Sequence, residues 1–471
     1  REGDPMRHPV WLTAEAGNPN GAQALFLIDG AEPGDIGRVD VLQVLDAMAA
    51  LSGVASSGPP CRGHFEHVEH GAHGEVADGV RRDLEARFVG GCVRNALIGA
   101  PVADLDIATD IVPDEVLRRL EAAGIAAVPT GIAHGTVTAI VDHKPFEITT
   151  LRRDVSTDGR RATVAFTTDW REDAARRDFT FNALYATAAG EVIDMTGGLA
   201  DLEARQVRFI GEPAHRIAED YLRILRFFRF HAWYGRGELD RAGLAACAAA
   251  KDGIQHLSGE RIHAELLKLL AAPDPVPALR QMASAGIIGE VLPGALDMGR
   301  LAKLVEIETT QLFAEGDALL RLAALIAGGP EARRQALARR LRFSNAEAAR
   351  LAAIDRTETK IVSYLSVREV RRALYRLTPP VFKDRAMLGW AADPRPHNAT
   401  QWRALLAMAD SWARPEMPLT GNDVLAAGVP NGPEVGRILE EVEEWWIDSD
   451  FTDDKFSLIE RLKAIVQATV Y

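Results

Sequence analysis

The hydrophobic pattern of the chain changes near residue 200, and this change is what most limits the possible folds. From residue 88 to about 195, short strand-like apolar runs are interspersed with amphipathic helical segments. Beyond residue 200, apolar residues recur almost entirely at helical spacing, with breaks at stretches rich in proline and glycine. The sequence therefore predicts an α/β or α+β domain that precedes an all-helical region, which makes α+β the expected fold class of the whole chain, and 471 residues are enough for several packed units.

Several elements of the mixed region can be assigned from short stretches. An apolar strand ends at a double glycine and is followed by a helix, and a second strand is followed by an amphipathic helix that ends in glycine. Two later strands flank the turn-prone "DHKP" and predict a hairpin. In chain order, the expected elements cover residues 86–89, 92–99, 104–109, 114–124, 135–141 and 144–151.

The first 86 residues have a different composition. They are rich in Gly, Ser and Pro, and only residues 39–51 have a convincing helical pattern, so we expect an atypical, partly disordered extension. His64, His67, His70 and His73 recur every third residue, which on a helix could offer two imidazoles to a metal. Glycines in the same stretch disfavour that helix, and we assign no metal site to the histidine run.

Cysteine usage indicates the compartment. Cys61, Cys92 and Cys247 are odd in number and far apart, which argues against a disulfide framework and for a reducing environment. We find neither a signal-peptide pattern nor an apolar run near the roughly 20 residues of a membrane span. We therefore expect a cytoplasmic protein without a membrane partner.

The formal net charge of −13 is carried by the two ends of the chain. Residues 1–87 contain 7 basic and 14 acidic side chains and residues 431–471 contain 4 and 10, which gives −7 and −6 and leaves the middle neutral. Within that middle, residues 205–241 and 333–342 are rich in arginine. A basic groove for RNA is compatible with this distribution, although a solvated helix face is the commoner explanation of any one such run.

Two aspartates at alternate positions of the strand at residues 104–109 raise the question of function. Side chains at i and i+2 on a strand project to the same face, so Asp104 and Asp106 would place two negative charges side by side. A solvated strand end accommodates such a pair, and for this motif alone it is the commoner explanation. The alternative is a divalent-cation site of hard oxygen ligands, to which Glu147 on the second hairpin strand could add a third carboxylate.

The double glycine upstream predicts a site for an anion. Gly90 and Gly91 would let backbone amides approach a ligand closely at the start of a helix, where unpaired N–H groups favour negative charge. Arg94 would lie one turn further into this helix and add a full positive charge. Glycine turns open many helices, but this one precedes two aspartates and therefore predicts a phosphate cradle beside a metal site.

Arginines are concentrated in residues 176–184 and 219–230. On a helix, four charged residues at i+3 steps would share one side: Asp220, Arg223, Arg226 and Arg229. A salt-bridge ladder is the simplest explanation, yet three arginines exceed what one aspartate can pair.

Six motifs together carry a resemblance to a known family. The motifs "GGCVRN", "DLD", "FEITT", "RRDFTFNAL", "EDYLR" and "GERIHAELL" occur in the order and rough spacing of the class II CCA-adding enzymes, the bacterial-type tRNA nucleotidyltransferases of the poly(A) polymerase/CCA family. The resemblance runs from about Arg87 through Leu270. It implies a polymerase-β-like nucleotidyltransferase head followed by an all-α neck, body and tail. The implied divisions are an extension at 1–86, a head at 87–195, a neck with the nucleotide-selecting helix at 196–285, a body at 286–385 and a tRNA-contacting tail at 386–471.

The resemblance also implies roles for particular residues. Asp104 and Asp106 are expected to bind Mg²⁺, with two ions in the site, and to form the catalytic set together with Glu147. The residues expected around the incoming nucleotide are Gly90, Gly91, Arg94, Arg177, Asp178, Asp220, Arg223, Arg226 and Arg229. Residues 152–169 resemble the flexible loop with which the family switches from adding C to adding A, and Asn95 stands where aspartate is usual.

Within that set, Asp220 and Arg223 resemble the amino-acid template for CTP and ATP. Cytosine and adenine present an amino donor beside an acceptor ring nitrogen, whereas uracil and guanine present a carbonyl beside a ring N–H. A carboxylate only accepts hydrogen bonds and a guanidinium only donates them, so this pair matches C and A and leaves U and G mispaired.

The expected function is template-independent addition of CCA to the 3′ end of tRNA from CTP and ATP by two-metal phosphoryl transfer. The expected partners are tRNA, CTP and ATP, and no protein partner is implied. A poly(A) polymerase is the enzymatic alternative. A noncatalytic RNA-binding protein is the other alternative, against which the acid set of Asp104, Asp106 and Glu147 argues.

Overall fold

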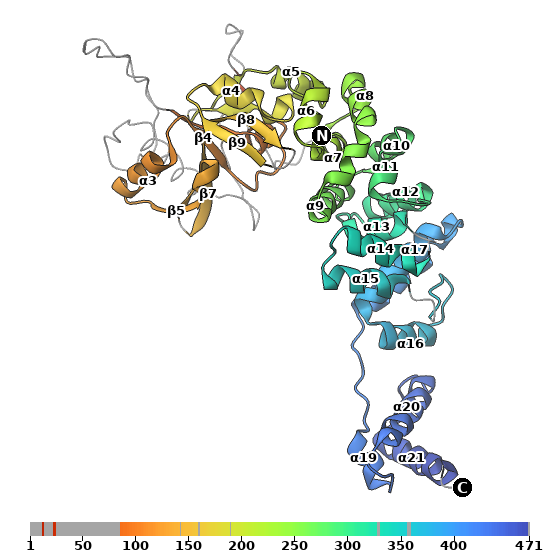
Figure 1. Ribbon diagram of the computed structural model, residues 1–471. Coiled ribbons are helices and arrows are strands. Elements are labelled where there is room, and N and C mark those ends of the chain that lie inside the picture. The colour runs from red at the N-terminus through yellow and green to blue at the C-terminus, as the bar shows by residue number, and fades with distance from the viewer. Residues whose placement is uncertain are drawn as a thin grey trace, which may run out of the picture. The chain divides into compact units, whose positions relative to one another are not determined.

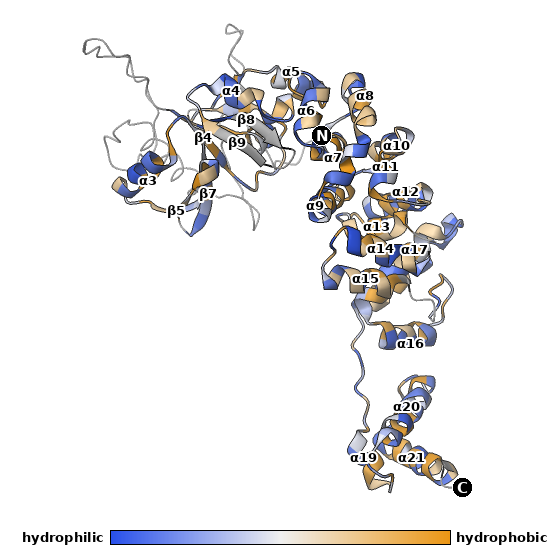
Figure 2. Ribbon diagram, in the orientation of Figure 1, coloured by the Kyte–Doolittle hydropathy of each residue, from blue (hydrophilic) through white to orange (hydrophobic). Residues whose placement is uncertain are grey.

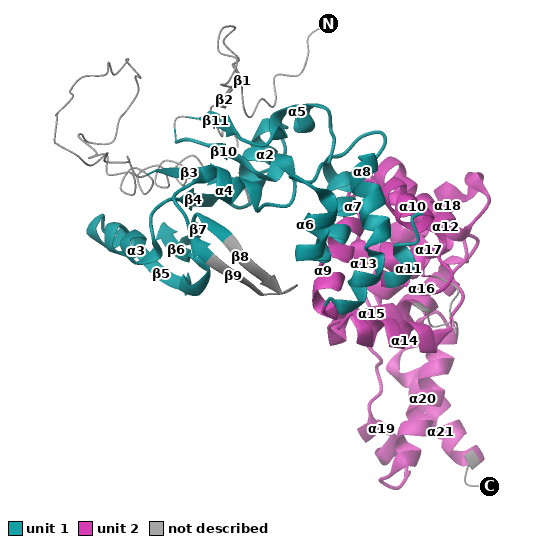
Figure 3. Ribbon diagram, turned by 45° about the horizontal axis from the view of Figure 1, so that its top comes forward, with its two compact units in different colours: residues 1–257, 285–290 teal, residues 258–284, 291–471 magenta. Residues whose placement is uncertain are grey.

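The computed structural model describes residues 12–13, 22–24, 85–141, 143–158, 161–188, 190–326, 330–355 and 359–469. The helix expected at 39–51, the histidine run and nearly all of the expected N-terminal extension lie outside these residues. The chain forms two compact units, residues 1–257 with 285–290, and residues 258–284 with 291–471 (Figure 3). The finer boundaries expected at residues 195, 285 and 385 stay predictions. Among the described residues, no helix is long and apolar enough to cross a membrane.

The first unit is built on a nine-stranded mixed sheet with the order β1-β2-β11-β10-β3-β4-β7-β6-β5. Its strands β4, β5 and β7 are labelled in Figure 1. Its strands are β1 (Leu12–Thr13), β2 (Ala22–Ala24), β3 (Ala86–Val89), β4 (Asp106–Thr109), β5 (Ala126–Gly131), β6 (Thr136–Val141), β7 (Lys144–Thr150), β10 (Leu184–Ala186) and β11 (Glu191–Asp194). The pair β4 and β7 is parallel, and the other neighbours are antiparallel. The expected α+β class and the expected hairpin of β6 and β7 are confirmed.

Helices cover this sheet and continue beyond it. They are α2 (Gly91–Leu97), α3 (Pro113–Ala122), α4 (Trp170–Ala175), α5 (Gly198–Glu203), α6 (Pro213–Glu219), α7 (Leu222–Tyr234) and α8 (Arg241–Ala249), with short 3₁₀ helices η1 (Ile132–His134), η2 (Thr180–Asn182) and η3 (Lys251–His256). The helices expected at 92–99 and 114–124 correspond to α2 and α3. Each begins one residue earlier than expected. The first residue of α3 is Pro113, and proline is favoured there because an N–H at this position would have no partner within the helix.

Two expectations about local structure were wrong, and a third segment takes a form that the sequence did not predict. The strand expected from residue 104 begins only at Asp106, because its neighbour β3 ends at Val89 and the chain turns away at Gly90. Asp220 is not helical: α6 ends at Glu219, Asp220 has extended backbone angles, and α7 starts at Leu222. The segment resembling a flexible loop forms a separate antiparallel pair of strands, β8 (Arg152–Asp158) and β9 (Arg161–Phe166).

The second unit is helical throughout its described residues, as the sequence predicts. The helices after residue 257 are α9 (Gly259–Leu270), α10 (Val276–Ser284), α11 (Ile288–Val291, which begins in the first unit), α12 (Met298–Glu306), η4 (Ile307–Gln311), α13 (Ala318–Leu325), α14 (Glu331–Arg340), α15 (Asn345–Asp355), α16 (Val367–Leu377), α17 (Pro379–Ala392), η5 (Pro396–Asn398), α18 (Ala399–Asp410), α19 (Gly421–Ala426), α20 (Pro433–Asp448) and α21 (Lys455–Thr469). Apolar and polar residues lie side by side along α20 and α21 (Figure 2), and the apolar ones, such as Val442, Trp446 and Leu458, form a shared core.

Candidate active site

Three carboxylates collect at one end of the central strands. Asp106 opens β4 and lies directly opposite Glu147 in the parallel pairing with β7. Asp104 precedes the strand by two residues, and it is exposed like Asp106 whereas Leu105 between them is buried. The expected sharing of one face therefore holds, even though Asp104 lies outside the strand. The three acids of the predicted catalytic set therefore lie at the same end of these strands, near enough for the charges of Asp104 and Glu147 to act on Asp106.

The electrostatics of this cluster favour a bound cation. Asp106 is exposed, yet the surrounding protein desolvates its carboxyl enough to raise its pKa, and the negative charges of Glu147 and Asp104 raise the pKa further. Arg177 acts in the opposite direction on the same carboxyl. A cation among these oxygens would relieve the repulsion, and carboxylate oxygens are the donors that Mg²⁺ prefers.

The number of converging acids limits the kind of metal site. In the described part of the chain, no three His, Cys, Asp or Glu side chains converge closely enough to hold an ion by themselves. Mg²⁺ commonly binds through one or two carboxylates and completes its shell with water and substrate phosphates. The donor set therefore fits Mg²⁺ shared with a phosphorylated substrate better than an all-protein cage.

Gly90 makes the turn between β3 and α2. Its φ of +76° lies in the region that side chains rarely adopt, and a Cβ there would meet the Asn182 carbonyl oxygen at 3.5 Å and Arg177 Nη1 at 3.6 Å. The helix α2 starts at the next residue, Gly91, and no side chain caps it. The positive φ is thus what requires a glycine at this turn, since a Cβ would meet both atoms only at ordinary van der Waals distance.

Arg94 is placed differently from the expectation that it faces a ligand. It is only 6% exposed, and its guanidinium donates to Asn182 Oδ1 at 2.6 Å, to the Tyr234 hydroxyl at 2.9 Å and to Asn95 Oδ1 at 2.8 Å. The same group lies 4.0 Å from the centre of the Tyr234 ring and 5.3 Å from that of Phe230. Burial lowers the pKa of Arg94. Its contacts are those of a brace between elements.

Asn95, the departure from the family motif, has a partner for both halves of its amide. Its oxygen accepts from Arg94 Nε and Nη2, and its Nδ2 donates to the Pro101 carbonyl at 2.8 Å. An ionised aspartate could accept from Arg94 but could not donate to that carbonyl.

Asp173 is a site residue that sequence reasoning missed. It is 1% exposed and accepts from Arg177 Nη2 at 3.0 Å, from Arg176 Nε at 2.8 Å and from the Tyr185 hydroxyl at 2.8 Å. Burial alone would raise the pKa of Asp173, but the two arginines hold it below the ordinary value. The available signal was the spacing, because Asp173 precedes the double arginine by three and four residues on α4.

Asp178 is the second buried carboxylate of this region. Its Oδ2 accepts from Arg226 Nε at 2.7 Å, and its Oδ1 accepts from Asn182 Nδ2 at 3.0 Å and from the Phe179 N–H at 2.9 Å. Although burial opposes it, the charge of Arg226 lowers the pKa of Asp178. The pairing joins the segment after α4 to α7, and Asn182 is a further residue that sequence reasoning missed.

Asp220 and Arg223, the expected template pair, flank the start of α7. The Asp220 carboxylate accepts from the Leu222 N–H at 3.1 Å. Arg223 forms an ion pair with Glu219 and donates to the carbonyls of Arg216 at 2.8 Å and Arg176 at 3.2 Å. One turn and two turns further along, the side chains of Arg226 and Arg229 lie 5.1 and 4.1 Å from the centre of the Phe230 ring.

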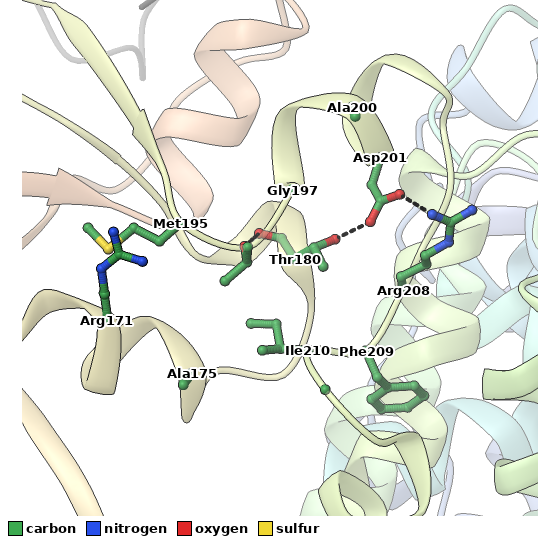
Figure 4. A pocket seen from close by; sticks show the side chains of 12 residues that line it. Arg171, Ala175, Thr180, Met195, Gly197, Ala200, Asp201, Arg208, Phe209 and Ile210 are labelled. Carbon is green, nitrogen blue, oxygen red and sulfur yellow. Dashed lines mark hydrogen bonds and ion pairs between the residues drawn. The ribbon is translucent and has the colours of Figure 1, made fainter. Parts of the chain in front are cut away.

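A groove of about 700 Å³ in the same unit is distinct from these residues (Figure 4). None of the predicted site residues lines it. Its polar side chains are largely satisfied by one another, since Thr180 donates to Asp201 at 2.7 Å and Arg208 pairs with Asp201 at 3.0 Å. We therefore assign no binding role to this groove, which is lined by residues between Arg171 and Gly211.

Comparison with known proteins gives consistent results. The family model described as "Poly A polymerase head domain" matches residues 86–208, and the model "Probable RNA and SrmB- binding site of polymerase A" matches residues 238–298. The mitochondrial CCA tRNA nucleotidyltransferase 1 of Mus musculus is 33% identical over 403 residues, which are 81% of this chain and 87% of the relative. The CCA-adding enzyme of Streptococcus gordonii is 34% identical over 381 residues, 79% of this chain and 91% of the relative.

Solved structures share the fold. The CCA-adding enzyme of Bacillus stearothermophilus, solved in complex with CTP, superposes with a TM-score of 0.67 at 24% identity, covering 91% of this chain and 98% of that one. The Thermotoga maritima enzyme, solved in complex with tRNA, gives a TM-score of 0.58 at 19% identity, covering 81% and 92%.

Proposed function

The chain belongs to the CCA-adding tRNA nucleotidyltransferases, and on that basis we propose how its residues add C, C and A to the 3′ end of tRNA from CTP and ATP. The observation that carries the proposal is the parallel register of β4 and β7, which sets Asp106 opposite Glu147 with Asp104 beside them. Nucleotidyl transfer needs little covalent chemistry from the protein, because positioning and neutralisation of phosphate charge supply most of the catalysis.

The carboxylates form the reacting end of the site. Asp104 and Asp106 would hold Mg²⁺, which when bound activates the attacking 3′ hydroxyl and neutralises the leaving pyrophosphate. Glu147 adds negative charge beside Asp106 and so strengthens the attraction for a cation. Arg177 is held near Asp106 by the buried Asp173, and its charge is available to the phosphates of the incoming nucleotide.

Asp220 and Arg223 form the selecting end. We infer that the carboxylate of Asp220 accepts from the exocyclic amino group of cytosine or adenine, while Arg223 donates to the adjacent ring nitrogen. Uracil or guanine would leave these polar groups mispaired, and that mismatch is costly in a desolvated site. The Arg223 guanidinium would exchange some of its contacts with carbonyls for contacts with the base.

Addition of single nucleotides tests this function. Purified protein is incubated with tRNA lacking its last three nucleotides and with one labelled nucleotide at a time, with Mg²⁺ or with a chelator. We expect CTP to be incorporated, ATP to be incorporated after two C residues, and the chelator to abolish both. Incorporation of UTP or GTP as readily as CTP would refute the proposed selection.

A further inference from the structure

One chain of hydrogen bonds joins three elements of the site. Arg94 on α2 donates to Asn182, the last residue of η2, and to Tyr234, the last residue of α7. These partners are 88 and 140 residues away in the sequence. Hydrogen bonds between residues so far apart in the sequence fix α2, η2 and α7 relative to one another.

Asn182 is the connecting group in this chain. Its oxygen accepts from Arg94 at 2.6 Å while its Nδ2 donates to Asp178 at 3.0 Å, and Asp178 in turn binds Arg226 on α7. A side-chain amide can accept and donate at the same time, whereas a carboxylate in this position would repel Asp178. The amide thus links the cationic Arg94 to the anionic Asp178.

Tyr234 holds Arg94 in two ways. Its hydroxyl accepts a hydrogen bond at 2.9 Å, and its ring lies 4.0 Å from the guanidinium carbon. The Phe230 ring, 5.9 Å from that of Tyr234, lies 5.3 Å from the same carbon. These contacts hold the guanidinium from both sides, so the position of Arg94 is that of a fixed brace between α2 and α7.

The brace connects the element expected to bind the phosphates of the nucleotide with the element expected to read its base. α2 follows directly from the turn at Gly90 and Gly91, the expected phosphate side, and α7 carries Arg223, the expected base-reading side. We propose that Asn182 and Tyr234 are positioning residues that hold Arg94, so that a correctly read base sets the phosphates in line for reaction. The inference rests on the function proposed above.

Loss of the Tyr234 hydroxyl should therefore uncouple base reading from chemistry. In Tyr234→Phe the ring stays on Arg94 but one hydrogen bond to a charged group is lost. We expect the ratio of kcat for CTP to kcat for UTP to fall about tenfold, the effect of one such hydrogen bond. The Kd with which the protein–tRNA complex binds CTP should change less than about twofold, because Tyr234 contacts Arg94 and not the residues proposed to read the base.

The ratio of kcat for CTP to kcat for UTP distinguishes a positioning role of Tyr234 from a merely structural one. A variant that is partly unfolded loses active enzyme equally for CTP and UTP, so its ratio of kcat values does not move. Asn182→Ser is the second variant, and because both residues act through Arg94 the double variant should lower the ratio by less than the product of the two single effects. Tyr364→Phe is the matched control, since Tyr364 is 69% exposed in the other unit.

Two failures are distinguishable. If the unmodified protein does not incorporate CTP into tRNA, the proposed function fails. If it does, and Tyr234→Phe and Asn182→Ser keep the CTP to UTP ratio of the unmodified protein, the coupling inference is overturned while the function stands.

Discussion

Asp106 lies where the charges of Glu147, Asp104 and Arg177 all act on one carboxyl group. Replacing it by alanine removes one of the two aspartates that would hold Mg²⁺. We expect nucleotide incorporation to fall by on the order of a thousandfold, because transition-state charge stabilisation of several kcal/mol is lost. tRNA affinity should change less than about twofold, because it depends mainly on phosphate contacts with basic side chains. Labelled-nucleotide incorporation and filter binding measure the two quantities.

Asp114→Ala provides the control for this substitution. Asp114 is an exposed aspartate in the first turn of α3, in the same unit as Asp106. Its removal should leave both measurements unchanged. An Asp106→Ala protein with near-normal incorporation would contradict the metal assignment.

Arg223 is expected to act on nucleotide choice more than on tRNA binding. Arg223→Ala removes the donor for the ring nitrogen of C and A, so the preference in kcat/KM for CTP over UTP should fall by at least about tenfold. Parallel reactions with CTP and UTP at limiting substrate measure this ratio. Arg118→Ala, on the solvent side of α3 and paired only with Glu115 in the described contacts, is the control. Unchanged discrimination in Arg223→Ala would count against the template role.

Asp173 is expected to matter for stability as well as for the site. Asp173→Asn leaves two partly buried arginines without their carboxylate, and we expect a loss of about 3 kcal/mol in the free energy of unfolding at pH 7. Because folding lowers the pKa of Asp173, its stabilising contribution is complete above the unfolded pKa of about 4 and is lost as the pH falls through the folded pKa. Chemical denaturation at pH 7 and at lower pH measures it.

The difference in free energy of unfolding between the unmodified protein and Asp173→Asn should therefore become smaller as the pH falls below about 4. Glu191→Gln, an exposed acid on β11, serves as the control and should match the unmodified protein. A pH-independent difference, or none at pH 7, would contradict the assignment.

Two glycines allow backbone strain at the site to be compared with backbone strain elsewhere in the same unit. Gly90 and Gly99 both have positive φ, but Gly90 makes the turn between β3 and α2 and lies in van der Waals range of Arg177, whereas a Cβ at Gly99 would meet nothing within 4 Å. Replacement by alanine should cost each protein about 1–2 kcal/mol of stability. Only Gly90→Ala should also lose most of its nucleotide incorporation. Equal activity of the two variants would show that the turn does not position the site.

Elements with a simple periodic pattern could be predicted from the sequence. β3, α2, β6 and β7 follow from apolar runs, alternation and glycine punctuation. The parallel pairing of β7 with β4 then sets Asp106 opposite Glu147. β5 could not be predicted, because its sequence "AAVPTG" contains Pro129 and Gly131 and lies at the edge of the sheet, where the lost ladder hydrogen bond costs little.

Other features depend on tertiary contacts that no local pattern contains. The i+3 spacing of charges runs through Asp220 without interruption, yet the chain leaves the helix there and the aspartate carboxylate binds the Leu222 N–H instead. The contacts of Arg94 could not be predicted from the sequence, because its partner Tyr234 lies 140 residues away. Spacing can identify which residues gather at a site but not which of them face each other.

For the molecule as a whole, the acidic net charge does not exclude an RNA substrate. Part of the acidic C-terminal region is neutralised within the second unit, where Arg371 on α16 pairs with Asp450 at 2.6 Å and Arg376 pairs with Glu444 on α20. The arginine-rich stretches in the middle of the sequence carry the groups expected to contact phosphates.

The composition of the finished 3′ end tests the central proposal most directly. Purified protein receives all four nucleoside triphosphates together with either tRNA lacking its last three nucleotides or an unstructured RNA, and the 3′ ends of the products are sequenced. A CCA-adding enzyme yields tRNA that ends in CCA and stops there, with little extension of the unstructured RNA. Long A tails on either RNA would instead identify a poly(A) polymerase, and unchanged ends on both would contradict catalysis altogether.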